Sequence, residues 1–358
     1  MNIYCYIIFY IIMFALALYA IKLDCKKRNY IFLLICFSFF LFYGFRDGMV
    51  GYDTKTYTRY YNSQSAESYV SVERLFYYLA VVFWTLHIPT KIYIAFLTLL
   101  VIILNGIAYY VAFKDDNKYL CISYVGMMCL PYAIMMNINV VRQGIAISTL
   151  LLAMVLCDKN KKVLATIVAI VGCMFHYMGF MILIAYVVLY LLKTRKNKLM
   201  FSIVWCIVGI VVGTFGIGEY ILNQIPNNSL TKRVLCYMDE PVTNAAIVRL
   251  VFYFAIALGM IAVIVFCNIE VNNVVTLFLA IFMMTGVGVS CMTVAHRTAM
   301  SMDIFIPLIL LNPATIQELE EKSGALRTKR YVHLVVIFCV MMYIFGIFCN
   351  PVKANLGF

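Results

Sequence analysis

Arg142 stands in a strongly apolar part of the chain, within the segment Asn137-Ile-Asn-Val-Val-Arg-Gln-Gly144. An arginine is always charged, and its burial in hydrocarbon is costly unless it faces a cavity or a partner. Asn139 and Gln143 lie four residues apart, so we expect both amides on one helix face with Arg142 beside them. Two amides and a guanidinium at a helix start suit phosphate oxygens or sugar hydroxyls.

A second polar segment, Phe45-Arg-Asp-Gly-Met-Val-Gly-Tyr-Asp-Thr-Lys-Thr-Tyr57, contains Arg46 close to the end of an apolar run. Its two glycines permit a tight backbone path. Asp53 is a candidate for chemistry, and the structural alternative is that Asp53 or the following threonine caps a helix. Tyr57 adds an aromatic ring with a hydroxyl group.

Two histidine motifs occur further along the chain. His176 lies in Phe175-His-Tyr177, in the middle of a long apolar run, and His296 and Arg297 precede another apolar run that contains Asp303. His296 and Asp303 are seven residues apart, which places them nearly in line on a helix. An ionisable residue such as Asp303 inside a membrane span lines a cavity, or forms an ion pair with a neighbouring helix.

The composition identifies an integral membrane protein. Hydrophobic residues make up 65% of the 358 residues, charged residues 12%, and the mean hydropathy is +0.95, whereas soluble domains carry about 25% charged residues. A net charge of +12 is compatible with nucleic-acid binding, but the basic residues gather in loops beside apolar runs. The 13 cysteines follow no zinc-binding spacing, so we expect buried apolar side chains and no metal site.

We predict an all-α polytopic membrane protein with about twelve transmembrane helices (10–14), because a spanning helix needs about 20 apolar residues. Residues 1–358 are expected to form one integral membrane domain. The candidate spans are 3–21, 30–45, 92–113, 119–136, 140–157, 162–175, 177–192, 199–217, 247–267, 274–292, 298–312 and 331–349.

Basic residues set the predicted orientation. With residues 22–30 in the cytoplasm, more than half of the 28 Lys and Arg residues fall in short cytoplasmic loops, as the positive-inside rule requires. Both termini then lie outside. This alternation requires the short apolar stretch Leu75–Ile88 to be re-entrant or interfacial, and a helical hairpin to turn near His176. Two longer outer segments remain, residues 46–91 and 218–246.

Under this topology five cationic or titratable side chains share the outer side of the membrane: Arg46, Arg142, His176, His296 and Arg297. A cationic cavity that faces both water and lipid suits an anionic amphiphile. A sugar carried on a lipid-linked diphosphate fits this description.

The order of these motifs resembles the EpsG-like family of exopolysaccharide biosynthesis proteins, which is related to the Wzy-type oligosaccharide repeat-unit polymerases. The motifs that carry the resemblance are Arg46 to Tyr57, Val141-Arg-Gln-Gly-Ile-Ala146, Phe175-His176 and His296-Arg297.

The resemblance implies a glycosyltransferase C-type membrane fold with an outward-facing cavity. It implies polymerisation of undecaprenyl (polyprenyl) diphosphate-linked units, as in capsule and O-antigen synthesis, at the outer face of the bacterial cytoplasmic membrane. Donor and acceptor would both be lipid-linked, and a chain-length regulator protein would be a partner, in addition to membrane lipids and without nucleic acid.

By the same resemblance Arg46, Arg142 and Arg297 would bind diphosphate, and Asp53, His176 or His296 would receive the acceptor proton. Asn139, Gln143, Tyr57 and Asp303 complete the predicted substrate site. The sequence contains no D-x-D motif, so we expect no cofactor and a metal-independent reaction in which arginines neutralise the diphosphate.

Other functions stay open at this point. A flippase for lipid-linked oligosaccharides also needs cationic cavity residues, but spread through the membrane midplane, where the predicted spans carry almost no charge except Asp303. A membrane O-acyltransferase acting on polysaccharide should have intramembrane histidines near the cytoplasm, and His333 is isolated there. A nonenzymatic assembly partner is the remaining alternative.

Overall fold

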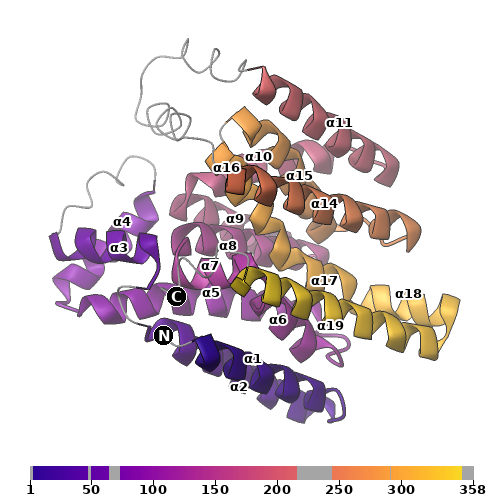
Figure 1. Ribbon diagram of the computed structural model, residues 1–358, viewed down its shortest axis with the longest axis horizontal. Coiled ribbons are helices and arrows are strands. Elements are labelled where there is room, and N and C mark those ends of the chain that lie inside the picture. The colour runs from indigo at the N-terminus through magenta and orange to yellow at the C-terminus, as the bar shows by residue number, and fades with distance from the viewer. Residues whose placement is uncertain (1–2, 47–49, 64–72, 216–243, 291, 349–358) are drawn as a thin grey trace. The chain divides into compact units, whose positions relative to one another are not determined.

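The computed structural model describes residues 3–46, 50–63, 73–215, 244–290 and 292–348. Within these ranges every regular element is a helix, which confirms the all-α prediction (Figure 1). The chain divides into two compact units, one of Met1–Gly179 with Asp303–Phe358 and one of Phe180–Met302. We call these unit 1 and unit 2. The prediction of a single membrane domain stays a prediction.

Unit 1 contains most of the helices that concern the candidate site. Its helices are α1 (Ile3–Ala20), α2 (Cys25–Gly44), α3 (Tyr52–Ser63), α4 (Arg74–Thr85), α5 (Thr90–Ala112), α6 (Leu120–Met128), α7 (Pro131–Ile138), α8 (Val141–Asp158), α9 (Lys162–Phe175), α17 (Ile306–Leu310), α18 (Pro313–Ser323) and α19 (Ala325–Phe348). Helix α8 packs between α5 and α9. Because it is buried on nearly every face, its polar residues have to find partners inside the protein.

Unit 2 contains α10 (Tyr177–Leu191, which begins in unit 1), α11 (Arg195–Thr214), α14 (Asn244–Phe266), α15 (Asn273–Val287), η2 (Gly288–Ser290), α16 (Met292–Met300) and η3 (Ser301–Phe305, which ends in unit 1). Helix α11 packs closely on α15, and Gly209 makes this possible. A Cβ atom at Gly209 would lie 2.4 Å from the backbone nitrogen of Val287. Small residues allow such close approaches between membrane helices.

Three helices of the described residues are individually long and apolar enough to cross a membrane: α5, α8 and α11. Two bent pairs raise this number to five if each pair counts as one span. Six further apolar helical segments of the described residues are 10–17 residues long: Tyr4–Ala20, Arg74–Thr85, Lys162–Phe175, Tyr177–Leu191, Leu250–Phe266 and Asn273–Val287. The twelve predicted spans therefore stay a prediction.

Two predicted spans are not continuous helices. The predicted span 119–136 is broken between α6 and α7, which meet at an angle of 71°. Pro131 begins α7 and cannot continue α6, because it lacks an N–H group and its ring clashes with the preceding turn. The predicted span 298–312 passes through α16, η3 and α17 and then bends by 51° into α18.

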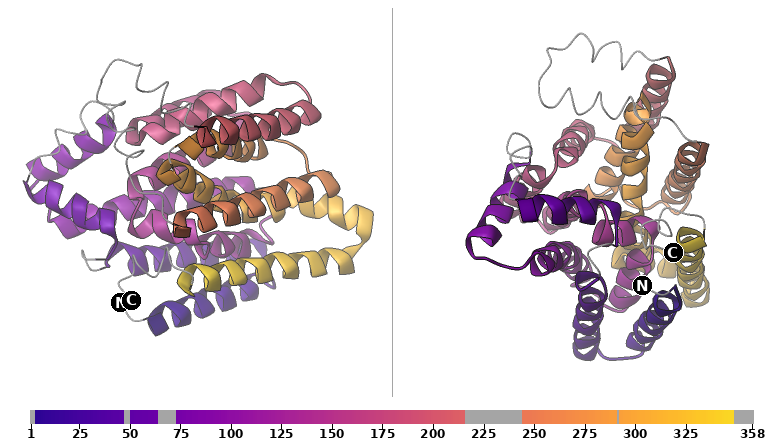
Figure 2. Two further views of the ribbon diagram at one scale, coloured as in Figure 1. Left: turned by 45° about the horizontal axis from the view of Figure 1, so that its top comes forward. Right: turned by 60° about the vertical axis from the view of Figure 1, so that its left-hand side comes forward.

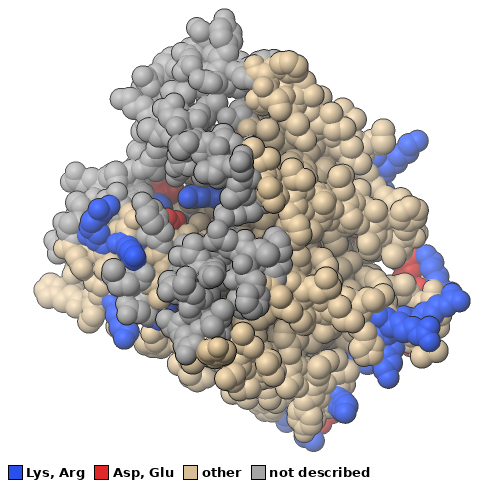
Figure 3. Space-filling model, viewed as in Figure 1, with Lys and Arg blue, Asp and Glu red and all other residues tan. Residues whose placement is uncertain are grey.

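The connections of unit 1 separate into two ends (Figures 1 and 2). Helices α3 and α4 lie at one end, and the turns between α1 and α2 and between α18 and α19 lie at the other. At this second end Arg28 donates to Asn117 over 2.6 Å, and Lys159 pairs with Asp115. Basic side chains are visible where α18 meets α19, beside a broad uncharged face (Figure 3). The orientation of the chain in the membrane stays a prediction.

Helix α4 corresponds to the stretch that we predicted to be re-entrant or interfacial. Its 12 residues have a length of about 18 Å at about 1.5 Å per residue, too short to cross a bilayer of about 30 Å. Phe76, Ala80 and Phe83 are buried on one face, whereas Tyr78 and Val82 are exposed. In the second outer segment, 218–246, the structure describes only residues 244–246, which begin α14.

Candidate functional site

Arg46 follows the end of α2 and is buried. Its guanidinium donates to the Tyr43 carbonyl (2.8 Å), to Thr98 Oγ1 (2.9 Å) and to Thr54 Oγ1 (3.0 Å), and more weakly to the Ile138 carbonyl at 3.4 Å. Burial lowers the pKa of Arg46 to about 10, so the side chain remains charged at neutral pH. Arg46 therefore ties α2, α3, α5 and the end of α7 together.

The start of α3 is attached to the end of α7 by two further contacts. Thr54 Oγ1 donates to the Ile138 carbonyl over 2.6 Å, and the Asp53 amide donates to Asn139 Oδ1 over 2.7 Å. Gly51 has φ +91°, and a Cβ atom there would lie 2.0 Å from the Ile138 oxygen. Only glycine can therefore occupy this position without a rearrangement.

These contacts correct two predictions. Asn139 does not share a helix with Gln143, because α8 begins at Val141 and Asn139 has non-helical angles of φ −128° and ψ −75°. Asp53 and Thr54, the predicted caps of the following helix, lie inside α3, which begins at Tyr52. The Asn139 side chain, from a distant part of the chain, satisfies the amide of Asp53 in the first turn of α3.

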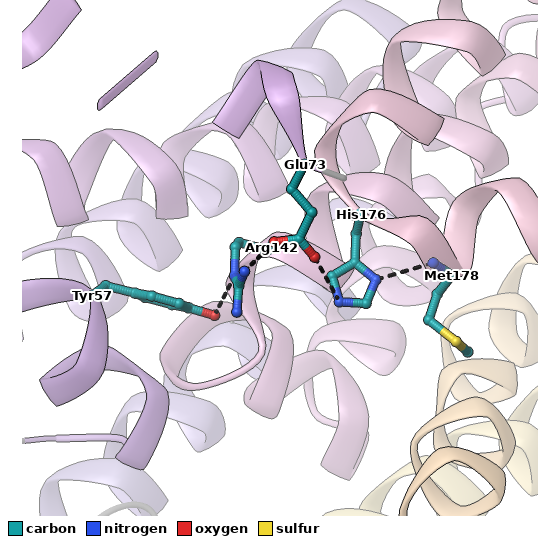
Figure 4. A network of polar contacts seen from close by, with 5 residues as sticks. All are labelled: Tyr57, Glu73, Arg142, His176 and Met178. Atoms are coloured by element: carbon teal, nitrogen blue, oxygen red, sulfur yellow. Dashed lines mark hydrogen bonds and ion pairs between the residues drawn. The ribbon is translucent and has the colours of Figure 1, made fainter. Parts of the chain in front are cut away.

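Arg142, the second residue of α8, is the centre of a polar network (Figure 4). Its Nη1 atom pairs with Glu73 Oε2, and its Nε atom donates to the Tyr57 hydroxyl over 3.3 Å. The guanidinium carbon lies 5.1 Å from the centre of the Tyr57 ring and 5.2 Å from that of Phe76. A charge pair and two cation–π contacts therefore hold Arg142 in one orientation.

His176 joins the same network from the junction of α9 and α10. Its backbone is extended, with φ −157° and ψ 134°, so the predicted helix break at this residue is confirmed. Its Nε2 atom lies 3.5 Å from Glu73 Oε1, and its Nδ1 atom accepts the Met178 amide over 3.2 Å. The network thus unites segments that are up to 119 residues apart along the sequence.

Burial differs among the charged members of the network. The Glu73 side chain is 1% exposed, whereas those of Arg142 and His176 are 16% and 11% exposed. Tyr57 and Phe76 are also buried, and burial raises the pKa of the Tyr57 phenol well above its ordinary value. Arg142 is therefore the most exposed of the three charged side chains, and His176 is nearly buried.

Tyr57 and Tyr61 do not form an exposed aromatic platform. The Tyr57 ring packs on Phe76 at a centroid distance of 5.7 Å, and Tyr61 stacks on Tyr93 at 4.6 Å. These rings form the packing between α3, α4 and α5. Their contribution to the site is to hold the segment around Arg142 in place.

Gln143 and Asp303 have other surroundings. Gln143 follows Arg142 on α8 and is buried. Asp303 is fully buried in unit 1, and its Oδ2 atom accepts the Tyr132 amide at 3.4 Å. Tyr132 is the second residue of α7, so Asp303 interacts with the positive end of this helix. That Asp303 lines a cavity or forms an ion pair stays a prediction.

His296 and Arg297 belong to α16 of unit 2. The side chain of His296 lies outside the described residues, and that of Arg297 is half-buried. The predicted cluster of Arg46, Arg142 and His176 with these two residues therefore stays a prediction. Among the described residues, no group of three or more His, Cys, Asp or Glu side chains is arranged to hold a metal ion.

Comparison with known proteins places the chain in a family. The sequence profile of the EpsG family matches residues 29–355, which is nearly the whole chain. The chain belongs to the EpsG family. No curated protein and no solved structure matches it. Membership of the EpsG family indicates a role in exopolysaccharide biosynthesis, and together with the apolar helices it indicates a membrane protein.

Glu73, which links Arg142 to His176, was not among the predicted site residues. A signal was present, because Glu73-Arg74 is a charged pair immediately before the apolar stretch that forms α4. An acid at the start of a helix is usually explained by favourable interaction with the helix dipole. This local explanation does not predict the contacts of Glu73 with Arg142 and His176, which lie 69 and 103 positions further along the chain.

Proposed function

We propose that this EpsG-family protein is a repeat-unit polymerase, a glycosyltransferase that joins polyprenyl-diphosphate-linked oligosaccharides. The observation that carries the proposal is the geometry of Arg142. Its guanidinium is held by Glu73 and Tyr57 at the start of α8, and it is partly exposed. A planar guanidinium with a fixed orientation is suited to bind the oxygens of a diphosphate.

The proposed reaction forms one glycosidic bond and breaks one bond to phosphate. An acceptor hydroxyl oxygen attacks the anomeric carbon of the donor glycan. The bond between this carbon and the diphosphate oxygen breaks, and its electron pair leaves with the diphosphate. Arg142 stabilises the negative charge that develops on the leaving group, and the acceptor proton passes to a basic side chain.

The location of the reaction follows from the predicted topology. We propose about twelve spans in a glycosyltransferase C-type fold whose cavity opens at the outer face of the bacterial cytoplasmic membrane, with both termini outside. Donor and acceptor are both lipid-linked, and a chain-length regulator is an expected protein partner. Reaction at this face fits the gathering of basic loops at the end of unit 1 opposite α3 and α4.

The three predicted diphosphate ligands are not equivalent. Arg142 is partly exposed and pairs with a carboxylate, whereas Arg46 is buried among neutral acceptors. We therefore propose Arg142 as the principal diphosphate ligand, with Arg297 as a second, and a structural role for Arg46. We further propose that arginine replaces a divalent metal, and that Asp53 or His296 receives the acceptor proton.

The decisive experiment substitutes Arg142→Ala and Arg142→Lys and measures surface polymer in cells, normalised to protein in the membrane. Arg74→Ala is the matched control, because Arg74 is exposed and lies next to Glu73. We expect both Arg142 variants to lose long polymer and to accumulate single lipid-linked units on the outer side, while the control is normal. Normal polymer in both variants would exclude Arg142 from the site. Accumulation of units on the cytoplasmic side would favour a flippase instead.

A further inference from the structure

The buried Glu73 carboxylate contacts Arg142 and His176, and the established family role does not assign it a task. We propose that Glu73 is a positioning residue that is held by His176 and orients Arg142 toward an anionic group of the substrate. This inference rests on the proposed diphosphate-binding role of Arg142. It concerns how the site is built rather than whether it binds diphosphate.

Exposure determines which of the three side chains can touch a ligand. Glu73 is 1% exposed and lies between Arg142 and His176, which are 16% and 11% exposed (Figure 4). Arg142 is therefore the most exposed of the three side chains, and we expect a ligand to meet the guanidinium and not the carboxylate. Glu73 therefore acts through its neighbours.

The two carboxylate oxygens have separate partners. Oε2 pairs with Arg142 Nη1, and Oε1 lies 3.5 Å from His176 Nε2 (Figure 4). Since the two oxygens of one carboxylate are a fixed distance apart, Glu73 sets the separation between the two donors. Tyr57 supports Arg142 from the other side through Nε, so the guanidinium is restrained at two atoms.

The Met178 amide determines the tautomer of His176. The Met178 amide can only donate, and it lies 3.2 Å from His176 Nδ1, so Nδ1 accepts this hydrogen bond. The neutral ring therefore carries its proton on Nε2, directed at Glu73. Both ring nitrogens are occupied, which makes His176 a hydrogen-bond donor to Glu73 and an unsuitable base in this arrangement.

The competing explanation is that Glu73 forms an ion pair that only stabilises the fold. Amide substitutions distinguish this structural role from the positioning role. Glutamine at position 73 has the shape of glutamate but only one carbonyl oxygen, so it can accept from Arg142 or His176 but not from both. At position 176, glutamine places an N–H group near the position of Nε2, whereas asparagine places its amide nearer to that of Nδ1. His176→Gln therefore keeps the donor to Glu73 and His176→Asn loses it.

The test measures long polymer per molecule of folded protein for Glu73→Gln, His176→Gln, His176→Asn and the double variant Glu73→Gln with His176→Asn. We expect Glu73→Gln to lose activity about tenfold to 100-fold, the range for a misplaced binding group, without loss of folded protein. His176→Gln should retain clearly more activity than His176→Asn. The double variant should be no worse than Glu73→Gln alone, because coupled residues are not additive.

Three results would overturn the inference: wild-type activity in Glu73→Gln, equal loss in the two His176 variants, or a loss in Glu73→Gln that only follows the amount of folded protein. A second measurement separates this failure from failure of the proposed function. Inorganic pyrophosphate binding to the purified protein, measured by calorimetry, should vanish in Arg142→Ala and persist in Glu73→Gln. If Arg142→Ala still binds pyrophosphate as the wild type does, the proposed function is contradicted. If Arg142→Ala loses pyrophosphate binding but Glu73→Gln keeps full polymer activity, only the positioning role of Glu73 is contradicted.

Discussion

Arg46 and Arg142 lie near helix ends in the same unit, but their surroundings differ in polarity and exposure. Arg46 is buried and donates to two backbone carbonyls and two threonine hydroxyls. Arg142 is partly exposed and pairs with a carboxylate and a phenol. Neutral acceptors inside the protein make Arg46 a cross-link between helices. A charged partner and partial exposure fit the binding role that we propose for Arg142.

The largest expected effect tests this contrast directly by replacing each arginine with lysine. Lysine keeps the charge but cannot reproduce the planar arrangement of donors. We expect Arg142→Lys to lose about 100-fold in polymer per folded molecule with a normal amount of protein. Arg46→Lys should lose folded protein while the remaining molecules stay active. Two measurements distinguish these outcomes: the amount of protein that stays folded after mild heating in detergent, and the length of the polymer. If Arg142→Lys lost folded protein and Arg46→Lys lost only polymer, the two assigned roles would be exchanged.

A smaller effect is expected at the attachment of α3 near Arg46. Gly51→Ala adds a Cβ atom within 2.0 Å of the Ile138 oxygen at a residue with φ +91°. Backbone strain of this kind costs about 1–3 kcal/mol, and the steric contact adds to it. We expect a lower midpoint of thermal unfolding in detergent. Gly259→Ala is the matched control, because no atom lies within 4 Å of a Cβ atom built there; equal midpoints in the two variants would contradict the assignment.

Asn139→Ala tests the hydrogen bond that begins α3. Loss of a side chain that caps a helix start costs about 1 kcal/mol, and Asn139→Asp keeps an acceptor oxygen for the Asp53 amide. We expect the alanine variant to be less stable in the same heating assay and the aspartate variant to be close to wild type. Equal stability of the two variants would show that this contact does not hold α3.

The smallest expected effect concerns the support of Arg142 by Tyr57. Tyr57→Phe removes the hydroxyl that accepts from Arg142 Nε but keeps the ring that lies 5.1 Å from the guanidinium. A single hydrogen bond contributes about 1 kcal/mol, so we expect a decrease in polymer of about fivefold and no loss of folded protein. Tyr57→Leu, which also removes the cation–π contact, should lose more. An equal loss in the two variants would assign the support to the hydroxyl alone.

Several helix boundaries agree with the sequence-based predictions. Predicted spans 92–113, 140–157 and 162–175 correspond to α5, α8 and α9 within two residues at each end. These boundaries follow from long apolar runs between short polar turns, which are local properties of the sequence. The helix break at His176 was also predicted, because only a break there keeps the basic loops on one side.

The candidate site was predicted only in part. Arg142 and His176 were singled out, and the structure brings them together through Glu73. The grouping of Arg46 with Arg142 stays a prediction. The placement of Asn139 on the helix of Gln143 was wrong, because residue type and spacing alone do not show where α8 begins. The bend between α6 and α7 and the attachment of α3 to Ile138 and Asn139 depend on contacts that no local pattern contains.

The sequence by itself therefore determined the helical class, the membrane character, the family and the positions of most helices, because hydrophobic runs and motifs act over short distances. The tertiary structure alone decided which charged groups meet. Glu73 faces Arg142 and His176, whereas Arg46 donates to neutral acceptors among the described residues. The physical reason is that a buried charge must be satisfied by whatever polar groups the packed helices bring to it, and these come from distant parts of the chain.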